Sequence, residues 1–267
     1  MLALGLLNQT GSGVAIVIDA CVAQHQGDRA EQQDRVAMFA HPRQPGVALA
    51  VVADGMGGRT GGALAAEQVL YTAKSSLEHF FPAENSPPQL IEGSLREAHT
   101  LIKTSRFINE KEPHSTAVLL LLQPGLVSWG HCGDSRLYHF RGGQLLRRTV
   151  DHSYVEHLVA TGKITAAEAL QHPHRNVLLA ALGGKDEPRI SLGMTATLLP
   201  GDAFVLCSDG LWAYLEDEEF GALVAANPAR RACEVLIELA RKRAAGGGDN
   251  ISLAVIKFER DSPRPRG

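Results

Sequence analysis

The residues of this chain that are best placed to do chemistry are aspartates at the ends of apolar runs. Asp54 and Asp209 each follow an apolar run of strand length and precede a glycine, and Asp249 has the reverse order, with its apolar run after it. Asp134 stands between two further apolar runs. Because a buried strand delivers its terminal residue to a cleft at the edge of a sheet, we expect these carboxylates to be held in fixed positions.

Carboxylates from remote parts of a chain can share one place when a cation lies between them. An Asp-Gly pair after a strand is most often a simple turn, and this applies to each of the four aspartates taken alone. Four such junctions together with the glycine-rich turn 55–58 are hard to obtain from turn chemistry. Mg²⁺ and Mn²⁺ prefer oxygen ligands, so the sequence predicts a hard-cation site built from Asp54, Asp209 and Asp249.

Other common catalytic arrangements are absent from the sequence. The chain has no Cys-x₅-Arg, no Walker-type Gly-x₄-Gly-Lys-Ser/Thr and no His-Glu-x-x-His. His131 and His152 are interpreted as packed or hydrogen-bonded side chains. Four cysteines stand singly in or beside apolar segments and are interpreted as reduced core thiols: Cys21, Cys132, Cys207 and Cys233.

Composition and charge narrow the possible partners. The 267 residues include 26 Lys and Arg against 29 Asp and Glu, a formal net charge of -3 without long blocks of one sign, so neither nucleic acid nor an anionic membrane is expected as a partner. The apolar stretch 1–7 has no basic region before it, and no apolar run reaches the roughly 18 residues that a membrane span requires. We expect a cytoplasmic, monomeric protein.

The apolar periodicity places these aspartates on a mixed set of elements. Strands are predicted at 14–22, 35–40, 47–53, 117–122, 126–131, 135–140, 202–208 and 251–258. Helices are predicted at 62–81, 89–108, 154–161 and 229–245, and a capping box, Thr165 to Glu168, opens one more. Strands and helices do not alternate as in a parallel doubly wound sheet, so we expect mixed or antiparallel sheets flanked by helices.

We expect a single domain over residues 1–258. The segment at about 151–181 is interpreted as a helical insertion, and residues 259–267 as a disordered tail.

Taken together, these motifs resemble those of the metal-dependent protein serine/threonine phosphatases, the PPM or type 2C family, in its bacterial form. The matching segments, in chain order, are 29–34 (Arg-x-x-Asn-x-Asp in the family), 54–58 (Asp-Gly-Met/His-Gly-Gly), 133–136 (Gly-Asp-Ser-Arg), 151–153 and 172–176 (the borders of its flap), 208–210 and 248–250. The resemblance implies an α+β fold: a central β-sandwich of two mainly antiparallel sheets flanked by helices on both faces, in four αββα layers, with a helical flap insertion.

The resemblance also implies a role for each matching residue. Asp54 would bridge two Mn²⁺ or Mg²⁺ ions, Gly55 would offer its carbonyl oxygen to one, and Asp209 and Asp249 would complete the other. Asp134 with Asp209 would hold a third, weaker ion. Asp34 would act through metal-bound water, and Arg29 would grip the substrate phosphate.

The implied function is hydrolysis of phosphoserine and phosphothreonine on proteins by a hydroxide that bridges two metal ions. Phosphorylated proteins would be the substrates, and the enzyme would reverse a bacterial Ser/Thr kinase. Gln32 and Gln33 replace the Asn and Glu of many relatives, and Met56 replaces the histidine of eukaryotic ones, so the general acid is unassigned.

Two alternatives remain open. A catalytically weak phosphatase-like domain could act by binding phosphoproteins, as Gln33 and Met56 suggest. A nucleotide-binding protein could use the loop 55–62, although no Lys-Ser/Thr follows it.

Overall fold

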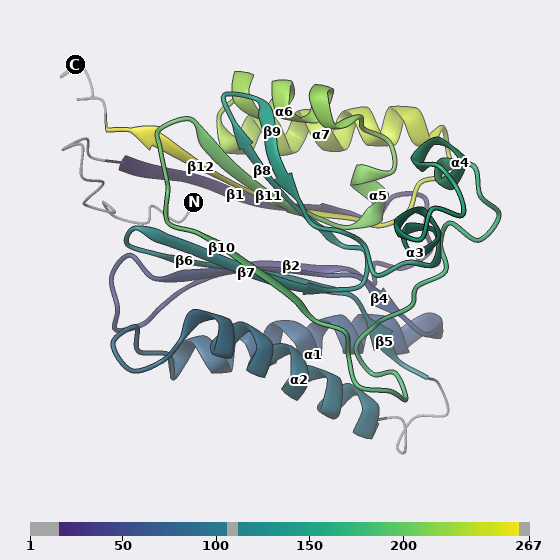
Figure 1. Cartoon of the computed structure of the whole chain (residues 1–267), viewed down its shortest axis with the longest axis horizontal. Coiled ribbons are helices and arrows are strands. Elements are labelled where there is room, and N and C mark those ends of the chain that lie inside the picture. Colours follow the sequence, from purple (N-terminus) through teal and green to yellow (C-terminus); the bar gives the residue numbers. More distant parts are fainter. Residues whose placement is uncertain (1–15, 106–111, 262–267) are drawn as a thin grey trace.

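The computed structural model describes residues 16–105 and 112–261 (Figure 1). The strands in these ranges are β1 (Ile16–His25), β2 (Arg35–Ala40), β3 (Ala48–Ala53), β4 (Gly55–Met56), β5 (His114–Ser115), β6 (Ala117–Gln123), β7 (Leu126–Cys132), β8 (Arg136–Arg141), β9 (Gln144–Arg148), β10 (Ser191–Thr195), β11 (Asp202–Cys207) and β12 (Ile251–Arg260). The helices are α1 (Gly58–Glu78), α2 (Pro87–Ser105), α3 (Tyr154–Ala160), α4 (Ala166–Leu170), α5 (Asp209–Trp212), α6 (Asp217–Ala226) and α7 (Ala229–Ala244).

Two five-stranded sheets pack face to face between two helical layers (Figure 1). Their strand orders are β1-β12-β11-β8-β9 and β10-β7-β6-β3-β2, and every pair within them is antiparallel. Helices α1 and α2 cover one outer face, and α6 and α7 cover the other. The predicted four-layer αββα sandwich is confirmed.

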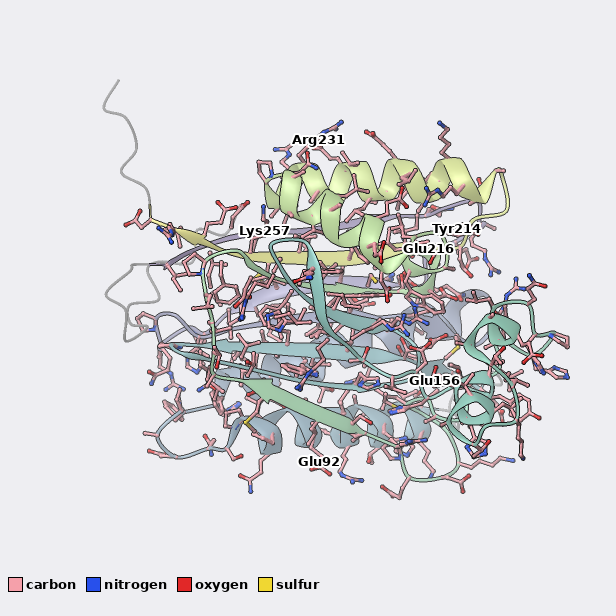
Figure 2. All side chains as sticks on the ribbon, turned by 45° about the horizontal axis from the view of Figure 1, so that its top comes forward. Glu92, Glu156, Tyr214, Glu216, Arg231 and Lys257 are labelled. Carbon is pink, nitrogen blue, oxygen red and sulfur yellow. The ribbon has the colours of Figure 1, made fainter. Side chains whose placement is uncertain are left out.

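The alternation of side chains along the central strands explains the layers. In β3, Leu49 and Val51 pack in the cluster under α1 and α2, whereas Ala50 and Val52 pack in the cluster between the sheets. Successive side chains of a strand point to opposite faces, so a strand that is apolar throughout can be buried on both sides. The outer helix faces meet water with charged side chains such as Glu92 on α2 and Arg231 on α7 (Figure 2).

The predicted elements are present with shifted ends. Helix α1 begins at Gly58, directly after the glycine turn, rather than at residue 62. Leu64 on this helix is 55% exposed although it is apolar. Strand β12 runs to Arg260, where Glu259 and Arg260 pair with β1, so these two residues belong to the sheet rather than to the predicted tail. Helix α6 was not predicted.

Some predictions fall on residues outside the described ranges. These are the apolar stretch at 1–7, residues 14 and 15 of the first predicted strand, residues 106–108 of the second predicted helix, and residues 262–267 of the tail.

The insertion between the two halves of the fold contains two short helices, α3 and α4. The Thr165 hydroxyl accepts a hydrogen bond from the Glu168 amide, and the Glu168 carboxylate accepts one from the Thr165 amide, which confirms the capping box. In the part of the chain that the structure describes, no helix combines the length and apolarity needed to cross a lipid bilayer.

Candidate active site

Strand register brings the predicted aspartates to one end of the sandwich. Arg35 pairs with Ala53, which places Asp34 beside Asp54 across β2 and β3. Similar pairings, Arg136 with Cys207 and His25 with Ile251, bring the other loops to the same end. Because these strands are antiparallel, loops that are far apart in the sequence meet at the same end of the two sheets.

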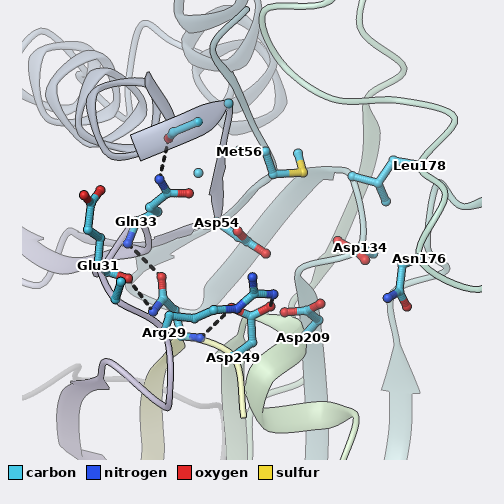
Figure 3. A pocket seen from close by; sticks show the side chains of 15 residues that line it. Arg29, Glu31, Gln33, Asp54, Met56, Asp134, Asn176, Leu178, Asp209 and Asp249 are labelled. Carbon is cyan, nitrogen blue, oxygen red and sulfur yellow. Dashed lines mark hydrogen bonds and ion pairs between the residues drawn. The ribbon is translucent and has the colours of Figure 1, made fainter. Parts of the chain in front are cut away.

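These loops enclose a cavity of about 500 Å³. Figure 3 shows the carboxylates of Asp54, Asp134, Asp209 and Asp249 directed into this space, with Arg29 at its rim. Gly55 also contributes to the wall. Six of the seven residues predicted for the site therefore line one cavity.

Asp34, the seventh, lies behind the cavity wall. It is only 1% exposed, and its carboxylate accepts a hydrogen bond of 2.6 Å from the Ser208 hydroxyl. The Ser208 hydroxyl in turn accepts a hydrogen bond of 3.0 Å from the Ser252 amide. This links Asp34 to β11, which ends just before Asp209, and to β12, which begins just after Asp249.

The main chain around Asp54 is fixed by its neighbours on β5 and β6. The Asp54 amide donates to the Thr116 hydroxyl at 3.2 Å, and the Asp54 carbonyl accepts from the Thr116 amide at 2.9 Å and from the Ser115 hydroxyl at 3.1 Å. With its backbone hydrogen bonds satisfied in this way, Asp54 can turn its carboxylate toward the cavity.

Asp134 is held by a side chain of α5. The Trp212 indole donates to the Asp134 carbonyl at 3.0 Å. The Arg136 guanidinium lies 3.5 Å from the centre of the Trp212 ring and donates two hydrogen bonds to Asp151, at 2.9 and 2.7 Å. A packed cation and an aromatic ring thus fix the loop between β7 and β8.

Arg29 and Asp249 form an ion pair at the cavity rim. Arg29 Nη2 donates to Asp249 Oδ2 at 2.5 Å, and the Asn250 amide donates to Asp249 Oδ1 at 2.7 Å. The Arg29 side chain is 62% exposed, so its guanidinium remains accessible from solution.

Two glycines allow the loops to approach this closely. A Cβ atom on Gly55 would lie 2.0 Å from the Gly62 carbonyl oxygen, and one on Gly27 would lie 1.9 Å from the Asp249 carbonyl oxygen. Gly27 also has a φ of +69°, which disfavours other residues. Larger residues at either position would separate the acidic loops.

The site's acids are crowded and largely removed from water. Burial raises the pKa of Asp34 to about 7, of Asp134 to about 8 and of Asp209 to about 6. It also raises the pKa of Asp54 well above its ordinary value, and the charges of Asp34 and Asp209 add to this effect. Holding all these groups ionised requires positive charge beyond Arg29.

This donor set fits hard divalent cations, because oxygen ligands in several carboxylates suit Mg²⁺ and Mn²⁺. Among the described residues, however, no three His, Cys, Asp or Glu side chains already form a ligand group for one ion. The carboxylates share a cavity without closing on a common point, so water molecules or side-chain rotation must complete a coordination shell. Mg²⁺ commonly retains several water ligands in proteins.

Gln33 and the segment that contains Asn250 were named in the sequence analysis, but their role in positioning the loops was missed. The Gln33 side-chain amide donates to the Gly58 carbonyl at 2.6 Å, and its backbone amide donates to Asn250 Oδ1 at 2.7 Å (Figure 3). The Asn250 side-chain amide donates to the carbonyls of Gln26 and Glu31. Only their position beside motif aspartates could have indicated these roles.

Comparison with known families matches residues 23–244 to the family described as protein phosphatase 2C. The serine/threonine protein phosphatase PstP of Mycobacterium tuberculosis (strain CDC 1551 / Oshkosh) is 32% identical over 218 residues, which is 79% of this chain and 40% of that protein. The chain thus matches less than half the length of this relative.

Solved structures agree with the family match. A serine/threonine phosphatase from S. agalactiae has a TM-score of 0.81 at 28% identity, covering 90% of this chain and 99% of that one. The catalytic domain of PstP in complex with 2 manganese ions has a TM-score of 0.76 at 28% identity, covering 91% and 99%.

The family predicted from the motifs is therefore confirmed, as is its fold. The chain belongs to the protein phosphatase 2C family of metal-dependent serine/threonine protein phosphatases.

Proposed function

We propose that residues 16–261 form one catalytic domain that hydrolyses phosphoserine and phosphothreonine esters on proteins. The observation that carries this proposal is the convergence of four carboxylates on one cavity with a guanidinium at its rim. Family membership and the manganese ions in the PstP structure support it.

Asp54, Asp209 and Asp249, with the Gly55 carbonyl, would hold two Mn²⁺ or Mg²⁺ ions, and Asp134 would help hold a third. When bound, such ions supply Lewis acidity and lower the pKa of water toward neutrality.

Arg29 is the residue proposed to bind the substrate phosphate. Its planar guanidinium can donate two parallel hydrogen bonds to phosphate oxygens, which a lysine could not reproduce. Its ion pair with Asp249 is at the exposed rim, and surface pairs of this kind contribute little stability, so exchange of the carboxylate for phosphate is inexpensive.

Asp34 is proposed to hold or release a proton behind the metal ligands. In the protein without bound cations, burial and the charges of Asp209 and Asp249, opposed by the hydrogen bond from Ser208, raise its pKa to about 7. Met56 lines the cavity where eukaryotic relatives have histidine, and no histidine is among the described residues that line it.

The experiment is release of phosphate from a phosphoserine peptide with millimolar Mn²⁺, with and without a chelator. We expect turnover that the chelator abolishes, and no turnover by Asp54→Ala protein whose circular dichroism matches that of the wild type. Retained binding of the phosphopeptide without turnover would instead favour a phosphoprotein-binding module.

The substrates, the cellular location and the oligomeric state are proposed from the names of the relatives and from the cysteines. The relatives carry names of serine/threonine protein phosphatases, which supports phosphoproteins as substrates and a Ser/Thr kinase as the opposing enzyme. The four cysteines are all free thiols, which agrees with a reducing, cytoplasmic location. We propose a monomer, which sedimentation of the purified chain would test.

A further inference from the structure

One wall of the acidic cavity carries two apolar side chains. Met56 and Leu178 lie on it, opposite Arg29 and beside Asp134 and Asn176 (Figure 3). Leu178 belongs to the segment 177–182, which follows α4 and returns from the insertion to the edge of the sandwich. An apolar side chain in a cavity built for phosphate requires its own explanation.

The segment is fixed at its first end to the base of the insertion. Leu178 forms an antiparallel bridge with Ser153. The Tyr154 amide donates to the Val177 carbonyl at 2.8 Å, and the Leu179 amide donates to the His152 carbonyl at 2.8 Å. Successive side chains of an extended segment point in opposite directions. Leu178 therefore faces the cavity, whereas Val177 and Leu179 point away from it.

His152 connects this bridge to the loop that carries Asp134. The His152 amide donates to the Gly133 carbonyl at 3.0 Å, and His152 Nδ1 accepts from the Gly133 amide at 3.3 Å. The imidazole is buried and stacked on His131, with ring centres 4.5 Å apart. Leu178 is therefore held at a set position relative to Asp134.

The second end of the segment is fixed beside Asp54. The Leu182 amide donates to the Ser115 carbonyl at 2.8 Å, and the Ser115 amide donates to the Leu182 carbonyl at 3.1 Å. The Ser115 hydroxyl donates to the Asp54 carbonyl. The segment spans the loops of two cavity aspartates, so the apolar wall is preformed.

We propose that Leu178, together with Met56, determines substrate specificity by contacting the side chain next to the phosphorylated serine or threonine. This proposal rests on the proposed function. With the phosphate held at the aspartates and Arg29, a neighbouring substrate residue comes to lie on this wall. An apolar side chain gains burial there, whereas an acidic one would lose hydration beside the carboxylate of Asp134.

The test compares phosphoserine peptides that carry Leu, Ala, Lys or Asp on one side of the phosphoserine and alanine on the other, in both orders. We expect kcat/KM to be about tenfold higher for Leu than for Asp on one side, chiefly through KM. In Leu178→Ala protein this ratio should fall to about two or less, and Leu178→Met should restore it.

Leu179→Ala is the matched control. Leu179 is the next residue, is 50% exposed and points away from the cavity, so its truncation should leave the Leu-to-Asp ratio unchanged. Thermal unfolding of each variant verifies that it is folded. If the Leu178→Ala protein does not fold, Leu178→Gln, which keeps the side-chain volume but makes it polar, takes its place.

The possible outcomes separate this inference from the function. Hydrolysis of the peptides and of p-nitrophenyl phosphate with no preference for Leu, or a preference that survives in the Leu178 variants, would overturn the apolar subsite alone. If neither the peptides nor p-nitrophenyl phosphate were hydrolysed with Mn²⁺, the proposed function would fail, and the subsite with it.

Discussion

The two ends of strand β11 place aspartates in opposite electrostatic situations. Asp202, its first residue, is fully buried, and its carboxylate accepts hydrogen bonds from Arg141 Nε at 2.7 Å and from the Leu199 amide at 2.8 Å. His139 Nε2 lies 3.3 Å from the same carboxylate. Asp209, two residues past the other end, shares a cavity with three more aspartates.

Their pKa values move in opposite directions. Burial by itself would raise the pKa of Asp202, but the nearby His139 ring and the hydrogen bonds from Arg141 and the Leu199 amide outweigh it, and the pKa is lowered. Burial and then the charge of Asp249 raise the pKa of Asp209 to about 6. At one end of the strand the protein itself supplies a cation, the Arg141 guanidinium, whereas the proposed function assigns the carboxylates at the other end to cations from solution.

The largest effect that tests this comparison is loss of Asp209. We expect Asp209→Asn to reduce phosphopeptide hydrolysis by on the order of a thousandfold, because the proposed function makes Asp209 a cation ligand. Chelated protein with this change should unfold at the same or a higher temperature than chelated wild type, because one repelling charge is gone. A lower unfolding temperature would mean that Asp209 is a structural acid like Asp202.

At the other end, Asp202→Asn should affect stability instead of catalysis. The change leaves the Arg141 guanidinium without its anion, so we expect a loss of about 2–3 kcal/mol in the free energy of unfolding. The kcat of the folded enzyme should remain within about twofold, since Asp202 is remote from the cavity. Urea denaturation and steady-state kinetics measure both quantities, and a large fall in kcat would refute the separation of roles.

Chelated protein should lose stability as the pH rises. The acids of the cavity have folded-state pKa values raised to about 6, 7 and 8 at Asp209, Asp34 and Asp134, against an ordinary value of 3.8. The folded state then binds more protons than the unfolded state, so its stability is highest at low pH and falls as the pH rises from the ordinary value toward these raised values.

Thermal unfolding between pH 5 and 8 measures this loss, and saturating Mn²⁺ should reduce it, because the cation favours the ionised carboxylates. Unfolding temperatures that rise with pH in the chelated protein would show that the cavity acids are already balanced by protein cations, as Asp202 is.

The smallest expected effect is on the Mn²⁺ requirement, when the neutral side chain of Gln33 is replaced by a carboxylate. Gln33→Glu adds a carboxylate near the cavity but loses the hydrogen bond to the Gly58 carbonyl, whereas Gln33→Met loses the same bond without adding charge. We expect the Glu variant to need three to ten times less Mn²⁺ than the Met variant for half-maximal activity, an estimate of roughly 1 kcal/mol from the added charge. Equal Mn²⁺ requirements would show that position 33 acts only through the loop.

The sequence alone predicted most of the strands and the helices that cover them. The continuous apolar run Ala48–Ala53 and the spacing of Leu90, Ile91, Leu95 and Ala98 are local signals, and these residues are buried as expected. Helix α6 was missed because its apolar residues do not form a clear stripe at helical spacing. The helix begins at the polar residue Asp217, and Pro228 follows its end.

For the site, residue type and position within a motif were enough to indicate which acids matter. A carboxylate between an apolar run and a glycine turn is a local feature, and Asp54, Asp134, Asp209 and Asp249 were identified from it. Their roles toward individual metal ions remain predictions.

Only the tertiary structure decided which carboxylates face the cavity and which partners they have. Asp34 lies behind the wall because Ser208, 174 positions away, donates to it, and Asp202 is balanced by residues of β8. Leu178 reaches the cavity because two distant backbone pairings fix its segment. Short stretches of sequence determine the tendency to form a strand, a turn or a helix, but the register that joins remote strands depends on the packing of the whole core.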